Sequence, residues 1–292
     1  MTPQDFDYLR QHLHERSGLV LSAEKQYLAE NRLLPVARRH GLSTLGELVG
    51  KLKIATPAPL TVEVVEAMTT NETFFFRDKL PFDHFRDTIL PALIDARARE
   101  KRIRIWCTAA STGQEPYSLA MMLKGNVGGL GAKLADFRSE IIATDISGEV
   151  LERAKAGIYS QFEVQRGLPI QQLVKFFTQV GESWQIAPEI RAMVQFRTLN
   201  LLKDFSGLGT FDVVFCRNVL IYFDQDTKID VLNRLARQMP EGGFLSLGAA
   251  ETVVGLTEAF KPMGEKRGLY VRNPAKAVAL EPGKVLKFAT KA

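Results

Sequence analysis

The chain has 292 residues, 46% of them hydrophobic and 24% charged, which is ordinary for a globular protein with room for one large α/β domain and a smaller unit. No apolar run approaches the ~18 residues of a membrane span, and the start lacks a secretion-signal pattern, so neither membrane insertion nor export is expected. The net charge of +5 suits a nucleic acid or an acidic protein partner equally.

Residues 1–70 are predicted to form a helical subdomain, because they contain amphipathic segments and no convincing strand. In the first segment Phe6, Leu9 and Leu13 recur at helical spacing. Gly18 follows as a natural helix stop.

Three further helices are predicted in this subdomain. Ser22 is placed to cap the second helix, which Pro35 is expected to kink or restart. Thr44 with Glu47 three residues later has the spacing of a capping box for the third. The fourth is expected over 60–68.

Residues 71–100 are predicted to be a linker followed by a connecting helix. The linker contains three consecutive phenylalanines, 74–76, which we expect to pack between the two subdomains, with covering of a bound cofactor as the alternative. The helix carries its apolar side chains at helical spacing: Phe82, Phe85, Ile89 and Leu93.

From residue 101 to 273, β-type apolar runs alternate with helical segments, which predicts a doubly wound, mostly parallel α/β sheet. Two runs are nearly continuous hydrophobes, typical of strands buried on both faces. The alternation lapses at about 157–192, which is read as an inserted subdomain, and 274–292 as a loosely ordered tail. The predicted strands are Ile103–Cys107, Ile141–Thr144, Val194–Thr198, Phe211–Cys216 and Phe244–Leu247.

The first predicted strand runs directly into a turn of small residues that opens an amphipathic helix. Ala109, Ala110, Ser111 and Gly113 let the backbone approach a ligand closely. The turn is not the GxGxxG dinucleotide fingerprint, because alanines occupy the expected glycine positions. A tight strand–helix connection without a ligand remains an alternative.

Polar residues follow two further strands. Asp145 ends the second predicted strand, where a carboxylate can accept hydrogen bonds from ribose hydroxyls, or can instead cap the helix that begins near Ser147. Arg217, Asn218 and Tyr222 follow the strand that ends at Cys216. No Pro-Pro-aromatic signature of a nucleic-acid amino-methyltransferase occurs there, which disfavours base methylation.

At this point the sequence resembles one family, the CheR-type chemotaxis receptor-glutamate O-methyltransferases. The resemblance covers nearly the whole chain except the tail. The segments that carry it are TTNETFFFRD (69–78), RIWCTAASTGQEPYSLAM (104–121), ATDIS (143–147), FDVVFCRNVLIYF (211–223) and GGFLSLGAAE (242–251).

The resemblance implies a class I S-adenosylmethionine methyltransferase fold with an N-terminal helical subdomain and a small β insertion. It implies methyl transfer from S-adenosylmethionine, which becomes S-adenosylhomocysteine, to receptor glutamates, forming methyl esters for sensory adaptation. The implied cofactor contacts are Asn71, Thr73, Arg77, Glu115, Asp145, Asn200, Leu201, Arg217 and Asn218.

The chemistry of ester formation predicts no general base, because a glutamate acceptor is already ionised near neutral pH. The enzyme must instead orient and desolvate the carboxylate. Arg77 is the candidate cation for this, and the resemblance implies a hydrogen bond from Tyr222 beside the reacting centre. The alternatives are a salt bridge of Arg77 with Asp78 or across the subdomain interface, and a core position for Tyr222.

No metal site is expected, because the four histidines (His12, His14, His40 and His84) form no cluster with cysteines or carboxylates. They are expected at the surface. The two cysteines, Cys107 and Cys216, are too few for a disulfide framework. They are predicted to end neighbouring strands as reduced thiols in a cytoplasmic protein.

Partner binding is expected on the second helix, where Arg32, Arg38 and Arg39 could dock the acidic cytoplasmic helices of a receptor. A merely solvated basic face is the alternative. The resemblance implies that the insertion is a β-subdomain, which in some members binds a receptor's C-terminal peptide. Here it is short, which favours a tether-independent enzyme.

The predicted protein is thus a monomeric, cytoplasmic signal-transduction enzyme recruited to receptor arrays, with no nucleic-acid partner. Two other functions stay open: a catalytically silent relative that only binds S-adenosylmethionine, and a methyltransferase for RNA or a small molecule.

Overall fold

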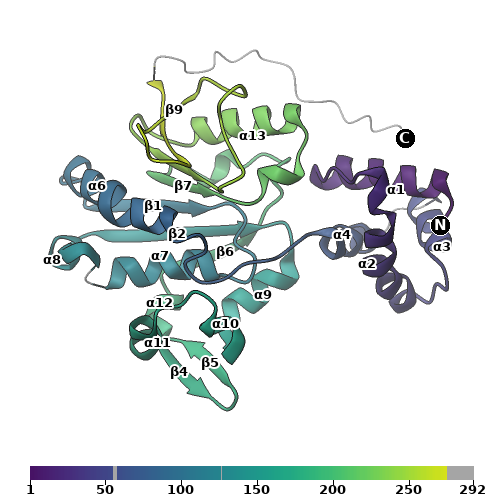
Figure 1. The fold of residues 1–292 in the computed structure, drawn as a ribbon, viewed down its shortest axis with the longest axis horizontal. Helices are drawn as coiled ribbons and strands as arrows, with labels where there is room; N and C mark the ends of the chain where they lie inside the picture. Colours follow the sequence, from purple (N-terminus) through teal and green to yellow (C-terminus); the bar gives the residue numbers. More distant parts are fainter. Residues whose placement is uncertain (55–57, 126, 275–292) are drawn as a thin grey trace.

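The computed structural model describes residues 1–54, 58–125 and 127–274, so the predicted tail lies outside the described residues except for Pro274. Figure 1 shows a small helical subdomain beside a larger α/β body, joined by an extended linker. The helical subdomain and the α/β body have separate apolar cores.

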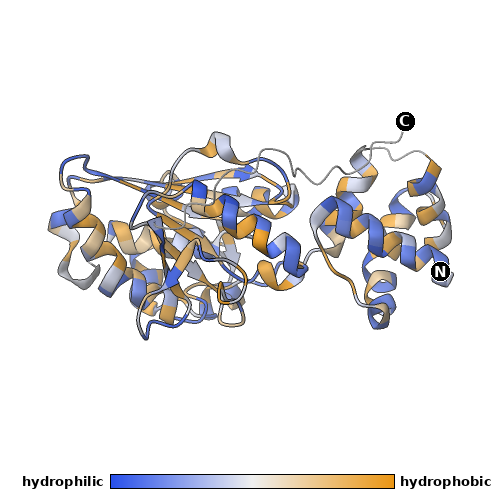
Figure 2. Ribbon diagram, turned by 90° about the horizontal axis from the view of Figure 1, so that it is seen from above, coloured by the Kyte–Doolittle hydropathy of each residue, from blue (hydrophilic) through white to orange (hydrophobic). Residues whose placement is uncertain are grey.

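The described part of the helical subdomain contains four α-helices: α1 Pro3–Ser17, α2 Gln26–Arg39, α3 Leu45–Ile54 and α4 Ala58–Met68. Each turns one apolar face inward, and the helices are accordingly banded in hydrophilic and hydrophobic colours in Figure 2. The largest fully buried side chains of this core are Leu9, Leu13, Leu33, Leu48, Leu52 and Leu60.

The helix boundaries are set largely by the predicted residues. Gly18 ends α1 in the left-handed conformation, with φ of 76°. The Thr44 hydroxyl accepts from the Glu47 backbone N–H, whereas the Glu47 carboxylate reaches Ser43 instead of Thr44, so the capping box is shifted by one residue.

Two details of the second helix differ from the prediction. Ser22 precedes a 3₁₀ turn, η1 (Ala23–Lys25), and its side chain makes no capping hydrogen bond. Pro35 lies inside a continuous α2 and does not interrupt it. The backbone around Pro35 tolerates the missing N–H because packing of the apolar face, rather than local propensity, holds this helix.

The connecting helix runs through α5 (Leu80–His84), a π-helical segment η2 (Phe85–Ile89) and α6 (Leu90–Ala96). The prediction that the linker aromatics pack between the subdomains is wrong for Phe75 and Phe76. Phe75 is fully buried in the α/β core, edge-on to Tyr159 at 5.0 Å between ring centroids. Phe76 packs edge-on against Phe82 at 5.2 Å.

The main sheet has seven strands in the order β6-β2-β1-β7-β8-β10-β9. The first five in this order are parallel, and the last two are antiparallel, which confirms the predicted doubly wound, mostly parallel fold. The strands are β1 Arg102–Cys107, β2 Arg138–Asp145, β6 Val194–Thr198, β7 Val213–Cys216, β8 Phe244–Leu247, β9 Phe260–Pro262 and β10 Leu269–Arg272.

Helices cover both faces of this sheet (Figure 1). Side chains of α6 and α7 (Gln114–Lys124) share one core with Ile103 and Ile105 of β1, whereas α13 (Gln225–Arg237) shares the other with Trp106. The remaining elements of this body are η3 Val127–Gly129, α8 Gly131–Leu134, α9 Gly148–Ala156, η4 Ser206–Leu208 and η5 Leu220–Tyr222.

The insertion forms a separate antiparallel sheet in the order β3-β5-β4. Figure 1 shows it projecting from the α/β body with α10 and α11 beside it. Its elements are β3 Ile158–Ser160, α10 Gln161–Gln165, α11 Ile170–Phe176, β4 Phe177–Val180, β5 Ser183–Ile186 and α12 Pro188–Arg191.

The cysteines end neighbouring strands, β1 and β7, as buried free thiols, and burial raises the pKa of both. The surface assignment of His12 and His84 is wrong, since both are buried, and burial lowers the pKa of each. Among the described residues no group of three or more His, Cys, Asp or Glu could hold a metal ion. None of the helices described here is long and apolar enough to cross a membrane.

Candidate functional site

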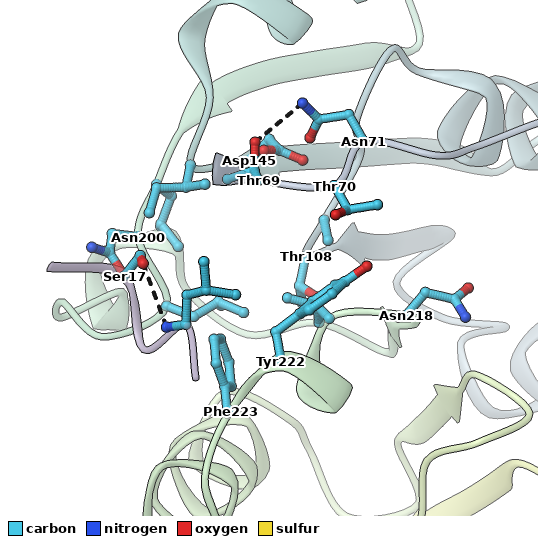
Figure 3. A pocket seen from close by; sticks show the side chains of 16 residues that line it. Ser17, Thr69, Thr70, Asn71, Thr108, Asp145, Asn200, Asn218, Tyr222 and Phe223 are labelled. Atoms are coloured by element: carbon cyan, nitrogen blue, oxygen red, sulfur yellow. Dashed lines mark hydrogen bonds between the residues drawn. The ribbon is translucent and has the colours of Figure 1, made fainter. Parts of the chain in front are cut away.

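A pocket lies where strand order reverses, beyond the carboxyl ends of the parallel strands (Figure 3). This is where open α/β sheets bind ligands. Six parts of the described chain line it: Ser17 and Leu19; Thr69 to Asn71; Thr108 and Ala109; Asp145 and Ile146; Leu199 to Leu201; and Asn218, Val219, Tyr222 and Phe223.

Asp145 ends β2 with its carboxylate between two turns. One oxygen accepts from the Ser111 backbone N–H at 2.8 Å, and the other from Ser147 at 3.0 Å. Burial raises the pKa of Asp145, and these N–H groups oppose that shift. Since Ser147 itself caps α9 through Val150, Asp145 is not the helix cap.

The small-residue turn after β1 approaches the linker and the second strand closely. Ser111 adopts a positive φ of 48°, and its hydroxyl donates to the Asn71 carbonyl at 2.8 Å. Gly113 has a φ of 94°, and an added Cβ would lie 3.0 Å from Ala154. The turn therefore brings the ends of β1 and β2 and the linker into contact.

The helical subdomain closes one side of the pocket, a contribution the sequence did not reveal. The Asn200 side chain donates to the Arg16 carbonyl at 2.6 Å, and the Val20 N–H donates to the Tyr222 carbonyl at 2.9 Å. Ser17 and Leu19 thereby face the strand ends (Figure 3). Their short polar–apolar sequence carries no motif that could have marked them.

The loop after β7 supplies the opposite wall. Asn218 adopts a positive φ of 58°, and Leu220–Tyr222 form the single turn η5. Figure 3 shows Tyr222 reaching into the pocket beside Thr108. Its hydroxyl has no hydrogen-bond partner among the described residues and is half-buried, so it remains available to a bound molecule.

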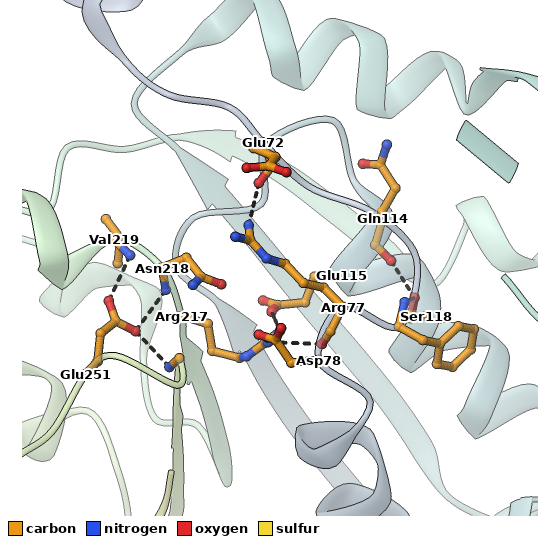
Figure 4. Close-up of polar contacts among 12 residues, drawn as sticks. Glu72, Arg77, Asp78, Gln114, Glu115, Ser118, Arg217, Asn218, Val219 and Glu251 are labelled. Carbon is orange, nitrogen blue, oxygen red and sulfur yellow. Dashed lines mark hydrogen bonds and ion pairs between the residues drawn. The ribbon is translucent and has the colours of Figure 1, made fainter. Parts of the chain in front are cut away.

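A buried charge layer lies behind this wall (Figure 4). The Arg217 guanidinium donates to Glu115 at 2.7 Å, to Asp78 at 2.8 Å and to the Arg77 carbonyl at 3.0 Å. Burial raises the pKa of Glu115, and Arg217 opposes that shift. Neither Arg217 nor Glu115 lines the pocket.

The predicted site residues of the linker do not all line the pocket. Asn71 lines the pocket, whereas Thr73 lines a separate polar groove that shares Asn71 with it. The Arg77 guanidinium stacks on Phe74 at 5.7 Å and donates to the Glu72 carbonyl at 2.6 Å. Of its five N–H donors, one is used among the described residues, and Asp78 pairs with Arg217 instead of Arg77.

The three arginines predicted to form a basic face on the second helix have different surroundings. Arg32 donates to the carbonyls of Met68 and Thr69, both at 2.8 Å, and thus fixes the end of α4. Arg39 pairs with Glu63 on α4. Arg38 is exposed, and its guanidinium makes no hydrogen bond or ion pair with another described residue.

The donor set of the pocket matches a nucleoside with an amino-acid arm. A buried carboxylate offers acceptors to vicinal hydroxyls, and side-chain amides (Asn71, Asn200, Asn218) can pair with polar groups. Leu19, Ile146 and Phe223 add apolar surface suited to a base. The residues present thus fit S-adenosylmethionine.

Nearly all of the described chain is similar to known proteins. Residues 71–269 match the family model described as CheR methyltransferase, SAM binding domain, and residues 4–69 match CheR methyltransferase, all-alpha domain. The chain is 42% identical to chemotaxis protein methyltransferase 1 of Pseudomonas aeruginosa, covering 92% of this chain and 97% of that protein. It is 39% identical to chemotaxis protein methyltransferase 1 of Vibrio cholerae, covering 89% and 94%.

Proposed function

The chain belongs to the CheR methyltransferase family, and from that premise we propose that it transfers methyl groups from S-adenosylmethionine to glutamate carboxylates of chemotaxis receptors. The product is a glutamate methyl ester, which serves sensory adaptation, and S-adenosylhomocysteine is released. The observation that carries the proposal is the convergence of Asp145, Asn218 and Tyr222 on one pocket at the switch point of the sheet.

Cofactor binding is proposed to depend on the pocket lining. When bound there, S-adenosylmethionine supplies an electrophilic methyl group. Asp145 accepts from the ribose hydroxyls, and Asn71, Asn200 and Asn218 hold polar groups, with Leu201 beside the base. Thr73 belongs to the adjoining groove, and Glu115 and Arg217 lie behind the pocket, so we propose that these three act through the shape of the site.

The acceptor carboxylate is proposed to be oriented by Arg77 and Tyr222. Arg77 has four N–H donors that the described residues leave unused, which suits a carboxylate because a guanidinium can bind both of its oxygens. The Tyr222 hydroxyl extends into the pocket and can donate beside the reacting centre. The protein moves no proton in this step, since the acceptor is already ionised.

Receptor docking is proposed to use the exposed guanidinium groups of α2. Arg38 and Arg39 face solvent at the subdomain that closes the pocket, and their charge would speed encounter with an acidic helical bundle. Arg32 contributes indirectly by holding α4. We propose a monomeric enzyme acting in the cytoplasm at receptor arrays, without a peptide tether to the inserted sheet.

The test of this function is label transfer from tritiated methyl-S-adenosylmethionine to receptor-containing membranes. Base-labile release of volatile methanol from the receptor band is expected, because only a carboxylate ester hydrolyses readily to methanol. Label that is stable to base, or found in RNA or small molecules, would refute glutamate esterification. Cofactor binding without any transfer would indicate a silent relative.

A further inference from the structure

Glu251 is a buried carboxylate that follows β8 and lies outside the pocket lining. It accepts four backbone hydrogen bonds, and those from Asn218 and Val219 can be followed in Figure 4. Oε1 accepts from Val219 at 2.9 Å and Leu220 at 2.8 Å, while Oε2 accepts from Asn218 at 2.8 Å and Gly248 at 2.7 Å. The residue is 9% exposed, so these hydrogen bonds are made largely without competition from water.

Three of the four donors belong to the loop that forms one wall of the pocket. β7 ends at Cys216, and the N–H groups of residues 218–220 have no strand partner. Asn218 also carries a positive φ of 58°, a left-handed conformation that is uncommon outside glycine but that asparagine tolerates. A carboxylate that binds three successive N–H groups favours one conformation of this loop over others.

Gly248 shows how closely the carboxylate is fitted to this loop. A Cβ on Gly248 would lie 2.7 Å from Glu251 Oε2 and 3.0 Å from the Asn218 nitrogen. The Glu251 N–H in turn donates to the Gly248 carbonyl at 3.0 Å. The turn from 248 to 251 therefore requires a glycine at its start for the carboxylate to reach the loop.

The loop is also held from its other side. Arg217, directly before Asn218, is anchored by its side chain to Glu115 and Asp78. Glu251 fixes the backbone of residues 218–220 through its hydrogen bonds. The ion pairs of Arg217 fix the start of the same loop. This loop carries Asn218 and Tyr222 into the pocket.

We propose that Glu251 is a positioning residue, which sets the conformation of loop 218–222 and so the placement of Asn218 and Tyr222 toward the bound cofactor. It does not touch the pocket and takes no part in bond making. This inference rests on the proposed function where it is tested by methyl transfer. Where it is tested by cofactor binding, the result does not depend on which acceptor is methylated.

The test is the isosteric variant Glu251→Gln, with Glu265→Gln, an exposed glutamate in the same part of the chain, as the matched control. In the glutamine variant an amide NH2 group takes the place of one carboxylate oxygen. This group cannot accept hydrogen bonds, so two backbone N–H donors lose their acceptor. S-adenosylhomocysteine binding measured by calorimetry should weaken about tenfold or more in Glu251→Gln, since buried donors are left unpaired. The control should bind like the wild type.

A second readout separates positioning from a loss of stability. Tyr222→Phe should slow methyl transfer by a large factor in the wild-type background and by little or nothing in Glu251→Gln, because the ring is already displaced. Equal slowing in both backgrounds, together with cofactor affinity within twofold of the wild type, would overturn the proposal.

If Glu251→Gln does not fold, Glu251→Asp decides, because its shorter side chain withdraws the carboxylate from the loop without removing charge and adds no atom against Asn218. Weakened cofactor binding by the folded aspartate variant supports positioning, and wild-type binding overturns it. Wild-type protein that binds S-adenosylhomocysteine but esterifies no receptor would defeat the proposed function while leaving these binding comparisons valid. Failure of the wild type to bind it would defeat both.

Discussion

The Arg217 guanidinium and the Glu115 carboxylate, 102 residues apart in sequence, form a 2.7 Å ion pair with side chains only 1% and 10% exposed. Removing one partner leaves a buried charge. Arg217→Met should therefore lower the free energy of unfolding by roughly 3–5 kcal/mol. Denaturant titration followed by circular dichroism measures this loss.

A double-mutant cycle provides the control for that pair. Arg217→Met combined with Glu115→Gln should cost clearly less than the sum of the two single changes, because the second removes the charge that the first leaves unpaired. Additive losses would mean that the two groups do not stabilise each other.

A second prediction concerns pH and Asp145. Burial raises the pKa of its carboxyl group, and a ribose hydroxyl needs the ionised form as acceptor. Affinity for S-adenosylhomocysteine should therefore be full above this raised pKa and fall as pH is lowered through it. Asp145→Asn should bind about 10- to 100-fold more weakly and lose this dependence. Calorimetric titration across the acid range measures both, and an unchanged pH profile in Asp145→Asn would exclude Asp145 from the effect.

A third prediction concerns the Tyr222 hydroxyl, which is free of protein partners among the described residues. Tyr222→Phe removes only that group and should reduce the methyl-transfer rate roughly tenfold, with cofactor affinity nearly unchanged. Single-turnover transfer and calorimetry give the two values. Wild-type turnover would place Tyr222 outside the chemistry.

A fourth prediction separates charge from size at Arg77. Arg77→Ala should raise KM for the receptor or lower kcat by about tenfold or more, because the acceptor carboxylate loses its bidentate partner. Arg77→Lys should recover only part of the activity. Full activity of the alanine variant would show that Arg77 does no more than support the linker through Glu72 and Phe74.

A fifth prediction tests docking through α2. Arg38→Glu should slow receptor methylation by about two- to tenfold at low salt, and the difference should shrink at high salt as screening increases. Arg99→Glu, an exposed change after α6 at the opposite end of the molecule in Figure 1, serves as control. Equal rates for both variants at low salt would remove α2 from the docking surface.

Much of the sheet could be predicted because parallel strands that are buried on both faces have nearly continuous apolar sequences. Val194–Thr198 and Phe244–Leu247 match β6 and β8 at both ends. The antiparallel strands β9 and β10 were not predicted, since Phe260–Pro262 contains a lysine and a proline and both strands are short. β10 pairs with β8 and β9 pairs with β10, so both strands depend on a neighbouring strand more than on local propensity.

Residues of the site could be predicted only where a polar side chain stands at or just after the end of a predicted strand. Asp145 ends β2 and Asn218 lies two residues after β7, so their convergence follows from topology. Ser17 and Leu19 meet them through the docking of a separate subdomain, which no local pattern encodes. Glu251 lay within a recognised segment, but its role depends on four backbone N–H groups that only the folded loop presents.

The most direct measurement is a crystal structure of the protein with bound S-adenosylhomocysteine. The nucleoside is expected in the pocket at the strand ends, with the ribose hydroxyls hydrogen-bonded to Asp145 and the sulfur on the side of Tyr222. A ligand bound outside this pocket, or an Asp145 carboxylate turned away from the sugar, would contradict this expectation.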